Sequence, residues 1–188
     1  MRLVECNGSE ISGNRLFGNE FSGMFLYSSN SNEITANNAS HNNQNGLSLL
    51  SCNQNVIRDN VIDSNAATGI WLNSSSDNEI YENNISNSQT GIQVTISTGN
   101  RVYHNNFRDN QEHSLDTEGT NIWDEGNVTG SNYWKDHVAK GNPSQEWPRM
   151  IKGGSMLDRY PFQNENGWLL SEKNEIASLN KYPSAIDT

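Results

Sequence analysis

The chain is poor in the residues from which most folds build a core. Only 32% of its 188 residues are hydrophobic, and it has two cysteines. No apolar run reaches the length of about 20 residues that a transmembrane helix needs, so we expect no membrane insertion. Lysine and arginine number 12, against 22 Asp and Glu. This shortage of positive charge argues against nucleic acid as a partner, since its recognition needs a basic surface.

What the sequence has in abundance is asparagine, arranged in a repeat. Similar segments begin at four glycines: Gly23 (GMFLYSSNSNEITANN), Gly46 (GLSLLSCNQNVIRDNV), Gly69 (GIWLNSSSDNEIYENN) and Gly91 (GIQVTISTGNRVYHNN). One aliphatic column and two asparagine columns keep the same spacing: Ile11, Ile34, Ile57, Ile80 and Val102; Asn14, Asn37, Asn60, Asn83 and Asn105; Asn32, Asn55, Asn78 and Asn100. Such a period is typical of a solenoid, in which one repeat alone cannot bury its apolar face.

The residues between the columns decide which solenoid this is. Leucine-rich repeats share the period, but Leu47 and Leu49 are followed by Ser, Cys, Asn and Gln instead of another leucine. Asn, Ser, Gly and Asp are weak helix formers, which argues against a helical repeat. Short strands remain, with Ile70 and Leu72 inward and Trp71 outward. We therefore predict an all-β fold, a right-handed single-stranded parallel β-helix with coils of 22–23 residues.

Stacked coils would place equivalent residues about 4.8 Å apart along the axis. Asparagine columns would then form ladders of side-chain amides at sharp corners, where asparagine tolerates a left-handed backbone. The predicted core is narrow and consists of these residues and their equivalents: Ile34, Ala39, Leu47 and Leu49. Cys6 and Cys52 share a column two coils apart, about 9.6 Å, which is too far for a disulfide. We expect two free thiols.

The repeat also sets the predicted domain boundaries. A β-helix domain covers residues 1–162 and begins inside a coil, since Leu3 aligns with Leu26. We expect the chain to be a fragment of a longer protein with neighbouring domains. The start MRLVECNGSE, which lacks the apolar middle of a signal peptide, then says nothing of location. Residues 163–188 are predicted to be a C-terminal cap or a linker, with one short helix capped by Ser171.

After residue 120 the repeat gives way to NIWDEGNVTGSNYWKDH and later to WPRMIKGGSMLDRYPF. Together with the asparagine-rich coils, these segments resemble the NosD-like β-helix family over residues 1–162. That family belongs to the wider group of carbohydrate-binding and sugar-hydrolase β-helices, and it is abundant among surface proteins of methanogenic archaea. The most specific part of the resemblance is the closing pattern of Trp123, Tyr133, Trp134, Asp158, Tyr160 and Pro161. The resemblance implies a parallel β-helix, an extracellular or cell-surface location and a glycan-related role.

Two departures from the family bear on metals. Relatives often carry an acidic, Gly-rich loop that resembles a calcium loop, whereas here only Glu146 follows Asp136 in this region. The family's namesake is tied to copper-site maturation, and copper needs soft or imidazole ligands that converge on one point. The histidines lie far apart in the sequence, at His41, His104, His113 and His137. We expect neither a metal nor another cofactor.

Asp59 and Glu82 are weak candidates for catalysis. Glycosidic hydrolysis uses two carboxylates about 5 to 9.5 Å apart, and these two lie one coil apart in a column with His104. A solvated acidic row accounts for the same pattern and is the favoured interpretation. The N-x-D, D-D, G-H-G and R-x-K motifs of pectinase-like β-helices do not occur in the sequence. Arg58 is the lone basic residue of its column, which argues against a lyase.

Outward aromatic residues suit sugars, because stacking covers the apolar face of a ring while amides pair with its hydroxyls. Three outward columns hold such residues: Phe25–Ser48–Trp71–Gln93, Tyr27–Leu50–Asn73–Thr95 and Thr35–Arg58–Tyr81–Tyr103. The predicted ligand-binding residues are Trp71 at the centre, with Phe25, Gln93, Asn73, Tyr81, Tyr103 and Arg58. The alternative is that a flanking loop, a neighbouring domain or a partner chain covers them.

The sequence thus predicts a non-catalytic carbohydrate-binding or scaffold module of a cell-surface or secreted protein. The negative net charge favours a neutral or amino sugar as the ligand. Two alternatives remain open, a glycoside hydrolase or lyase acting on a polysaccharide and a structural spacer of an envelope layer. A groove with two convergent carboxylates would favour the enzyme.

Overall fold

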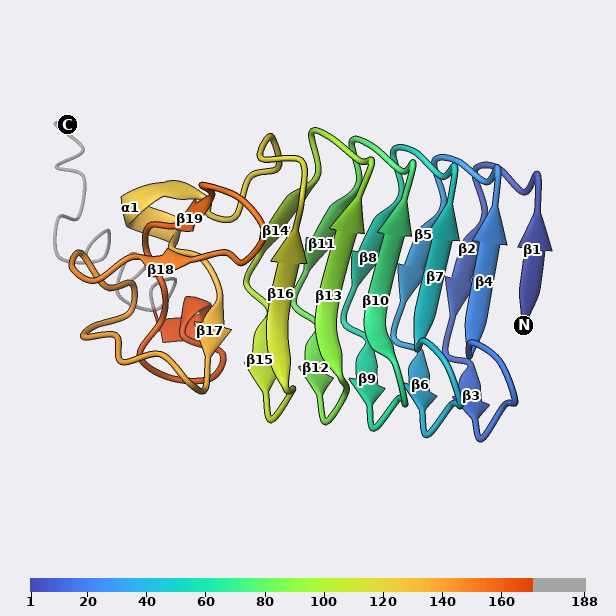
Figure 1. Cartoon of the computed structure of the whole chain (residues 1–188), viewed down its shortest axis with the longest axis horizontal. Coiled ribbons are helices and arrows are strands. Elements are labelled where there is room, and N and C mark those ends of the chain that lie inside the picture. Colours follow the sequence, from blue (N-terminus) through green and yellow to red (C-terminus); the bar gives the residue numbers. More distant parts are fainter. Residues whose placement is uncertain (171–188) are drawn as a thin grey trace, which may run out of the picture.

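The computed structural model describes residues 1–170 and shows a parallel β-solenoid. Three sheets run along its axis, and nearly every coil contributes one short strand to each of them (Figure 1). Equivalent strands of successive coils pair in parallel, so that Ile34 lies beside Ile57 and Ile57 beside Ile80. The predicted all-β parallel β-helix and its coil length of about 23 residues are confirmed.

The three sheets are called sheet A, sheet B and sheet C. Sheet A contains β1 (Arg2–Val4), β4 (Met24–Tyr27), β7 (Leu47–Leu50), β10 (Thr68–Asn73), β13 (Thr90–Thr95) and β16 (Glu112–Asp116). Sheet B contains β2 (Glu10–Ser12), β5 (Glu33–Thr35), β8 (Val56–Arg58), β11 (Glu79–Tyr81) and β14 (Arg101–Tyr103). Sheet C contains β3 (Arg15–Phe17), β6 (Asn38–Ser40), β9 (Val61–Asp63), β12 (Asn84–Ser86), β15 (Asn106–Arg108) and β17 (Tyr133–Trp134).

The core is a narrow column of aliphatic side chains that all three sheets supply. The predicted core residues are fully buried: Ile34, Ala39, Leu47 and Leu49. Each inward position stacks on its equivalent in the next coil, as Leu49 does on Leu72. Because one coil contributes only a few such residues, the coil is stable only when neighbouring coils cover it.

The asparagine columns form the predicted ladders. Asn60 Nδ2 donates to Asn83 Oδ1 of the next coil at 2.9 Å and to the Ile34 carbonyl of the preceding coil at 2.8 Å. The backbone N–H of Asn60 donates to the same Asn83 oxygen at 3.0 Å. Each amide thereby joins three coils and satisfies backbone groups at a buried corner, which would otherwise cost free energy.

A third ladder of the same kind was not predicted. It runs along the corner between sheets C and A through Asn19, Asn42 and Asn65, and the Asn42 amide donates to Asn65 Oδ1 at 2.8 Å. Ser88 interrupts this column, although its backbone N–H still donates to Asn110 Oδ1 at 3.0 Å. The 23-residue spacing was visible in the sequence, but the serine breaks the pattern.

The glycine column marks a place where successive coils approach too closely for a side chain. A Cβ atom on Gly69 would lie 2.5 Å from the Gly91 carbonyl oxygen and 2.8 Å from Ile85 Cγ2. Gly69 itself is inside strand β10, so the requirement is for space and not for an unusual backbone conformation. The column therefore fixes the spacing at which sheet C turns into sheet A.

The two cysteines are free thiols, as predicted. Cys52 lies in a fully buried column with Ser29 and Ser75, and its backbone N–H donates to Ser75 Oγ at 2.9 Å. The Cys52 sulfur in turn lies 3.4 Å from the Ser29 backbone nitrogen, whose hydrogen bond it accepts. Burial raises the pKa of the Cys52 thiol, which favours the uncharged form at this position.

A compact segment after residue 120 covers the C-terminal end of the solenoid (Figure 1). It contains α1 (Gly126–Thr129) and an antiparallel pair, β18 (Arg149–Met150) with β19 (Leu157–Asp158). Trp134 stacks on Phe107 of the last regular coil, with ring centroids 4.3 Å apart. The Trp134 indole N–H donates to the buried Asp158 carboxyl at 2.6 Å, which explains part of the closing pattern.

The end of the described chain adds to this covering. Trp168 is buried and stacks on His104 with ring centroids 5.4 Å apart, whereas Leu169 and Leu170 are exposed. The predicted helix that begins at Ser171 lies outside the described residues. Within residues 1–170, no helix has the length and apolarity that crossing a membrane requires.

Candidate functional site

The outward column of sheet A has the register that the repeat predicts. Trp71 of β10 pairs with Ser48 of β7 and with Gln93 of β13, and Phe25 of β4 pairs with Ser48 from the other side. Phe25, Trp71 and Gln93 are half-buried. The column thus presents two aromatic side chains, two coils apart, on the outer face of one sheet.

Ser48, between the two aromatic residues, points outward but is only 1% exposed. Its hydroxyl lies 2.9 Å from Ser22 Oγ and accepts a 3.0 Å hydrogen bond from Asn45 Nδ2. Both partners come from the turns that lead from sheet C into sheet A. Side chains of these turns therefore cover the middle of the column, and Ser48 is not available as a contact surface.

Two hollows lie along this column beside the same turns. The first has a volume of about 450 Å³ and is lined by Gln44, Asn45, Ala67, Thr68, Trp71 and Gln93. The second has a volume of about 580 Å³ and is lined by Met1, Arg2, Asn19, Glu20, Phe21, Ser22, Phe25 and Gln44. Because Gln44 lines both, the hollows are neighbours along the axis. We call them together the sheet A groove.

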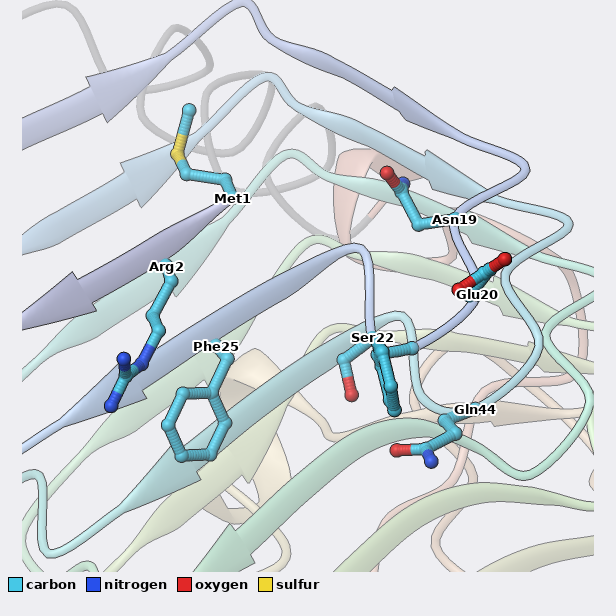
Figure 2. Close-up of a pocket in the computed structure, with 8 residues that line it drawn as sticks. Met1, Arg2, Asn19, Glu20, Ser22, Phe25 and Gln44 are labelled. Carbon is cyan, nitrogen blue, oxygen red and sulfur yellow. The ribbon is translucent and has the colours of Figure 1, made fainter.

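Figure 2 shows the second hollow. The side chains of Arg2 and Phe25 project from adjacent strands on one side, and Gln44 and Asn19 belong to the turns on the other (Figure 2). The groove is therefore bounded on one side by the strand face of sheet A. On the other side it is bounded by the successive turns that lead from sheet C into sheet A, which we call the ridge of turns. Gln44 is exposed, so its amide is available to a ligand in either hollow.

Hydrogen bonds between coils hold the ridge of turns in place. Asn45 Oδ1 accepts from the Thr68 backbone N–H at 3.0 Å, and the Gly46 N–H donates to the Thr68 carbonyl at 2.9 Å. The Ala67 N–H donates to the Gln44 carbonyl at 3.0 Å. Gln44 and Asn45 were absent from the predicted ligand-binding residues. Their position just before the glycine column is the signal that could have revealed them.

The predicted residues Tyr81, Tyr103 and Arg58 lie on sheet B, away from the sheet A groove. The two tyrosine rings stack with centroids 5.2 Å apart and an angle of 9° between planes. Arg58 forms ion pairs of 2.5 Å with both Glu33 and Asp59. Burial raises the pKa of both tyrosine hydroxyls, which keeps them neutral. The structure therefore does not bring this column together with Trp71.

Asn73 is on the same strand as Trp71 but does not belong to the lining of the groove. It pairs with Leu50 and Thr95 in the second outward column of sheet A. Its side-chain oxygen accepts a 3.0 Å hydrogen bond from Ser74 Oγ. Of the predicted ligand-binding set, the structure gathers three residues at the groove: Phe25, Trp71 and Gln93.

The weak catalytic candidates Asp59 and Glu82 occupy equivalent corners after sheet B. Their backbones have φ of 55° and 56°, the left-handed conformation of a sharp turn. Asp59 is bound by Arg58, and neither residue belongs to the lining of the sheet A groove. Glycosidic hydrolysis needs two carboxyls that face one ligand. This pair therefore does not supply them to a ligand in the sheet A groove.

The histidines differ in their surroundings. His113 is buried between Asn110, 3.1 Å from its Nδ1, and Asp136, 3.4 Å from its Nε2. His104 Nε2 lies 2.9 Å from the Thr129 carbonyl oxygen, and His137 Nε2 lies 2.7 Å from the Trp147 carbonyl oxygen. Within residues 1–170, no three His, Cys, Asp or Glu side chains lie close enough together to hold a metal ion. These donors do not fit a copper centre, which needs converging ligands.

Asp136, the acidic residue of the N-Y-W-x-D motif, also has a structural partner. Arg149 Nη1 donates to its carboxylate at 2.6 Å and Nη2 donates at 3.2 Å. The same guanidinium lies over the Trp134 ring, 4.6 Å from the centroid. Asp136 therefore helps to fix the C-terminal covering of the solenoid.

Comparison with solved structures supports the fold. A crystal structure of a double mutant of the periplasmic alginate epimerase AlgG has a TM-score of 0.53 and 22% sequence identity. The alignment covers 61% of this chain and 29% of that chain, so the present chain spans less than a third of the epimerase. At this identity the likeness concerns the fold alone. No curated protein matches the chain.

A family model covers more of the sequence. The model described as "Periplasmic copper-binding protein (NosD)" matches residues 1–142, which include the solenoid and the first part of the closing pattern. The histidines and cysteines described above do not form a set of donors that fits the copper named in that description. The match nevertheless spans well over half of the 188 residues, and the chain therefore belongs to the NosD family.

Proposed function

We propose that the chain is a non-catalytic carbohydrate-binding β-helix that works outside the cytoplasm, with the sheet A groove as its binding site. The location is supported by the descriptions of the family and of the structural neighbour, both of which name periplasmic proteins. The neighbour is an alginate epimerase, which links this fold to a polysaccharide in at least one protein. The side chains of the groove supply the ring surface and the amides that would contact a sugar.

The observation that carries the proposal is the surroundings of Trp71. Trp71 is half-buried in a hollow whose other lining residues are amides, a threonine and an alanine. An indole ring covers the apolar face of a sugar at a small cost in side-chain entropy. The amides of Gln44 and Gln93 can each donate to one sugar hydroxyl and accept from another. This combination suits a carbohydrate better than a fully apolar or a charged ligand.

The charge of the site favours neutral or amino sugars. All six residues that line the hollow at Trp71 are uncharged, while the chain as a whole has a formal net charge of −10. A polyanion such as a uronic acid polymer would meet a repulsive field without a compensating cation beside Trp71. Arg2 and Glu20, which carry opposite charges, line the other hollow of the groove.

A panel of soluble oligosaccharides, titrated calorimetrically into the protein, tests the proposal. We expect saturable binding of a neutral or N-acetylated oligosaccharide, without release of smaller sugars. Release of sugar that disappears in the variant Asp59→Asn or Glu82→Gln would instead identify a glycoside hydrolase or lyase. Neither binding nor release across the panel would leave the structural envelope spacer as the remaining function.

A further inference from the structure

We infer that the sheet A groove selects straight polysaccharides with a disaccharide repeat, the geometry of β-1,4-linked hexoses, and that it reads this repeat with Phe25 and Trp71. The inference rests on the proposed carbohydrate-binding function and narrows its ligand class. It follows from the spacing of the two aromatic residues, from the covered serine between them and from the course of the groove.

The spacing is set by the solenoid. Phe25 and Trp71 occupy the same outward position two coils apart, with Ser48 as the intervening member of the column. Two coils span about 9.6 Å along the axis, which is close to the length of one disaccharide in an extended β-1,4-linked chain. Successive sugars in such a chain are rotated by about half a turn, so every second sugar presents the same face. Two aromatic residues at this spacing can therefore stack on equivalent faces.

The middle coil is adapted to the sugar between those two. Ser48 is buried under Ser22 and Asn45, so a third ring platform is missing from the column in the described chain. Gln44 lines both hollows and is exposed. Its amide offers hydrogen bonds at the level where the intervening sugar turns its other face and its hydroxyls toward the protein.

The course of the groove is straight. The column keeps strict register from Arg2 through Phe25, Ser48 and Trp71 to Gln93. Asn45 and Thr68 fix the ridge of turns alongside through a 3.0 Å hydrogen bond between neighbouring coils. An α-1,4-linked chain of the same length curves, because its sugars are not related by a half turn. Such a chain cannot lie on both aromatic residues at once.

The test compares ligands of equal length and different linkage. Cellohexaose and chitohexaose are the β-1,4-linked probes, and maltohexaose is the α-1,4-linked probe, each titrated calorimetrically into the full chain. We expect one of the β-linked hexasaccharides to bind at least about tenfold more tightly than maltohexaose. The disaccharide of the preferred series is expected to bind more weakly than the trisaccharide, which is the first length that reaches both aromatic residues.

Variants separate the two contacts. Phe25→Ala is expected to weaken binding of the tetrasaccharide and hexasaccharide about tenfold while the disaccharide, held at Trp71, keeps its affinity. Tyr27→Ala is the matched control, since Tyr27 is an exposed aromatic residue of the same strand in the neighbouring outward column. Thermal melting verifies that each variant is folded, and Phe25→Leu replaces Phe25→Ala if the latter is not.

The outcomes distinguish this inference from the proposed function. Equal affinity for maltohexaose and the β-linked hexasaccharides, or loss of disaccharide binding in Phe25→Ala, would overturn the disaccharide-repeat inference while carbohydrate binding stands. Failure of every oligosaccharide of the broad panel to bind would overturn the proposed function itself.

Discussion

Asn60 Nδ2 lies 2.9 Å from Asn83 Oδ1, one coil further along the solenoid, and both side chains are almost completely buried. The same Asn60 nitrogen donates to the carbonyls of Ile34 and Arg58, each at 2.8 Å. One amide thus satisfies backbone groups of its own coil and of the coil before it. The stability of the fold depends on such polar contacts as well as on the narrow core.

Replacement of this amide should destabilise the protein. Asn60→Ala removes one donor each from the Ile34 carbonyl, the Arg58 carbonyl and the Asn83 side-chain oxygen, and we expect a loss of about 1 to 3 kcal/mol in the free energy of unfolding. Asn43→Ala is the control, because Asn43 is an exposed asparagine outside the ladders. Urea denaturation measures both. Equal stability of Asn60→Ala and the parent would contradict the structural role of the ladder.

The glycine column predicts a steric effect. In Gly69→Ala, the new methyl group would lie 2.5 Å from the Gly91 carbonyl oxygen, a backbone atom that cannot move without separating two coils. We expect a loss of about 1 to 3 kcal/mol in the free energy of unfolding. Gly154→Ala is the comparison, since its nearest neighbour would be 3.4 Å away. A Gly69→Ala protein with the same melting temperature as the parent would contradict the close approach of the two coils at Gly69.

Asp158 predicts a dependence of stability on pH. Burial raises the pKa of this carboxyl from its ordinary value of 3.8 to about 7, against the opposing effect of the Trp134 and backbone N–H donors. Because the folded pKa lies above the unfolded one, the contribution of the protonated acid is present below about pH 4. It is lost as the pH rises from there through about 7.

The variant Asp158→Asn isolates this contribution, because other groups titrate in the same range. The parent's free energy of unfolding minus that of Asp158→Asn should fall between about pH 4 and pH 7 and be constant outside that window. The variant is expected to be less stable throughout, since an amide NH₂ cannot accept the hydrogen bonds that N–H groups donate to the carboxyl oxygens. The readout is the slope of this free-energy difference against pH, measured by urea denaturation at several pH values. A constant difference would contradict the raised pKa.

Metal removal is expected to have no effect on stability. A metal that binds only the folded state raises the melting temperature, so a chelator would lower it again. His113 already lies beside Asn110 and Asp136, and Asp136 is bound by Arg149. Differential scanning calorimetry with and without EDTA checks this prediction. A lower melting temperature in EDTA that added copper or calcium restores would refute it.

The regular part of the fold was predictable because a fixed period converts directly into contacts. Once Ile34, Ile57 and Ile80 are recognised as one column, the parallel pairing of their strands follows, and so do the amide ladders at the corners. The third ladder was missed because Ser88 replaces an asparagine in it. A single substitution hides a column from pattern reading, although the backbone N–H still makes the equivalent bond.

The candidate site was predictable only in part. The period places Trp71 and Tyr81 on outward positions, but it does not tell how far the chain turns between β10 and β11, which belong to different sheets. The burial of Ser48 depends on side chains of Ser22 and Asn45, which belong to turns and not to its own column. Turn residues have no fixed inward or outward alternation, so their contribution to the groove requires the three-dimensional structure.

The most direct measurement is the affinity of Trp71→Ala for the oligosaccharide that binds the parent best, determined calorimetrically beside Trp147→Ala. Trp147 is a 63% exposed tryptophan of the C-terminal covering, outside the sheet A groove. We predict that Trp71→Ala loses about 2 kcal/mol of binding free energy, or roughly 30-fold in affinity, because the main stacking surface is removed. Trp147→Ala should bind like the parent. Unchanged affinity in a folded Trp71→Ala protein, or an equal loss in both variants, would contradict binding at the sheet A groove.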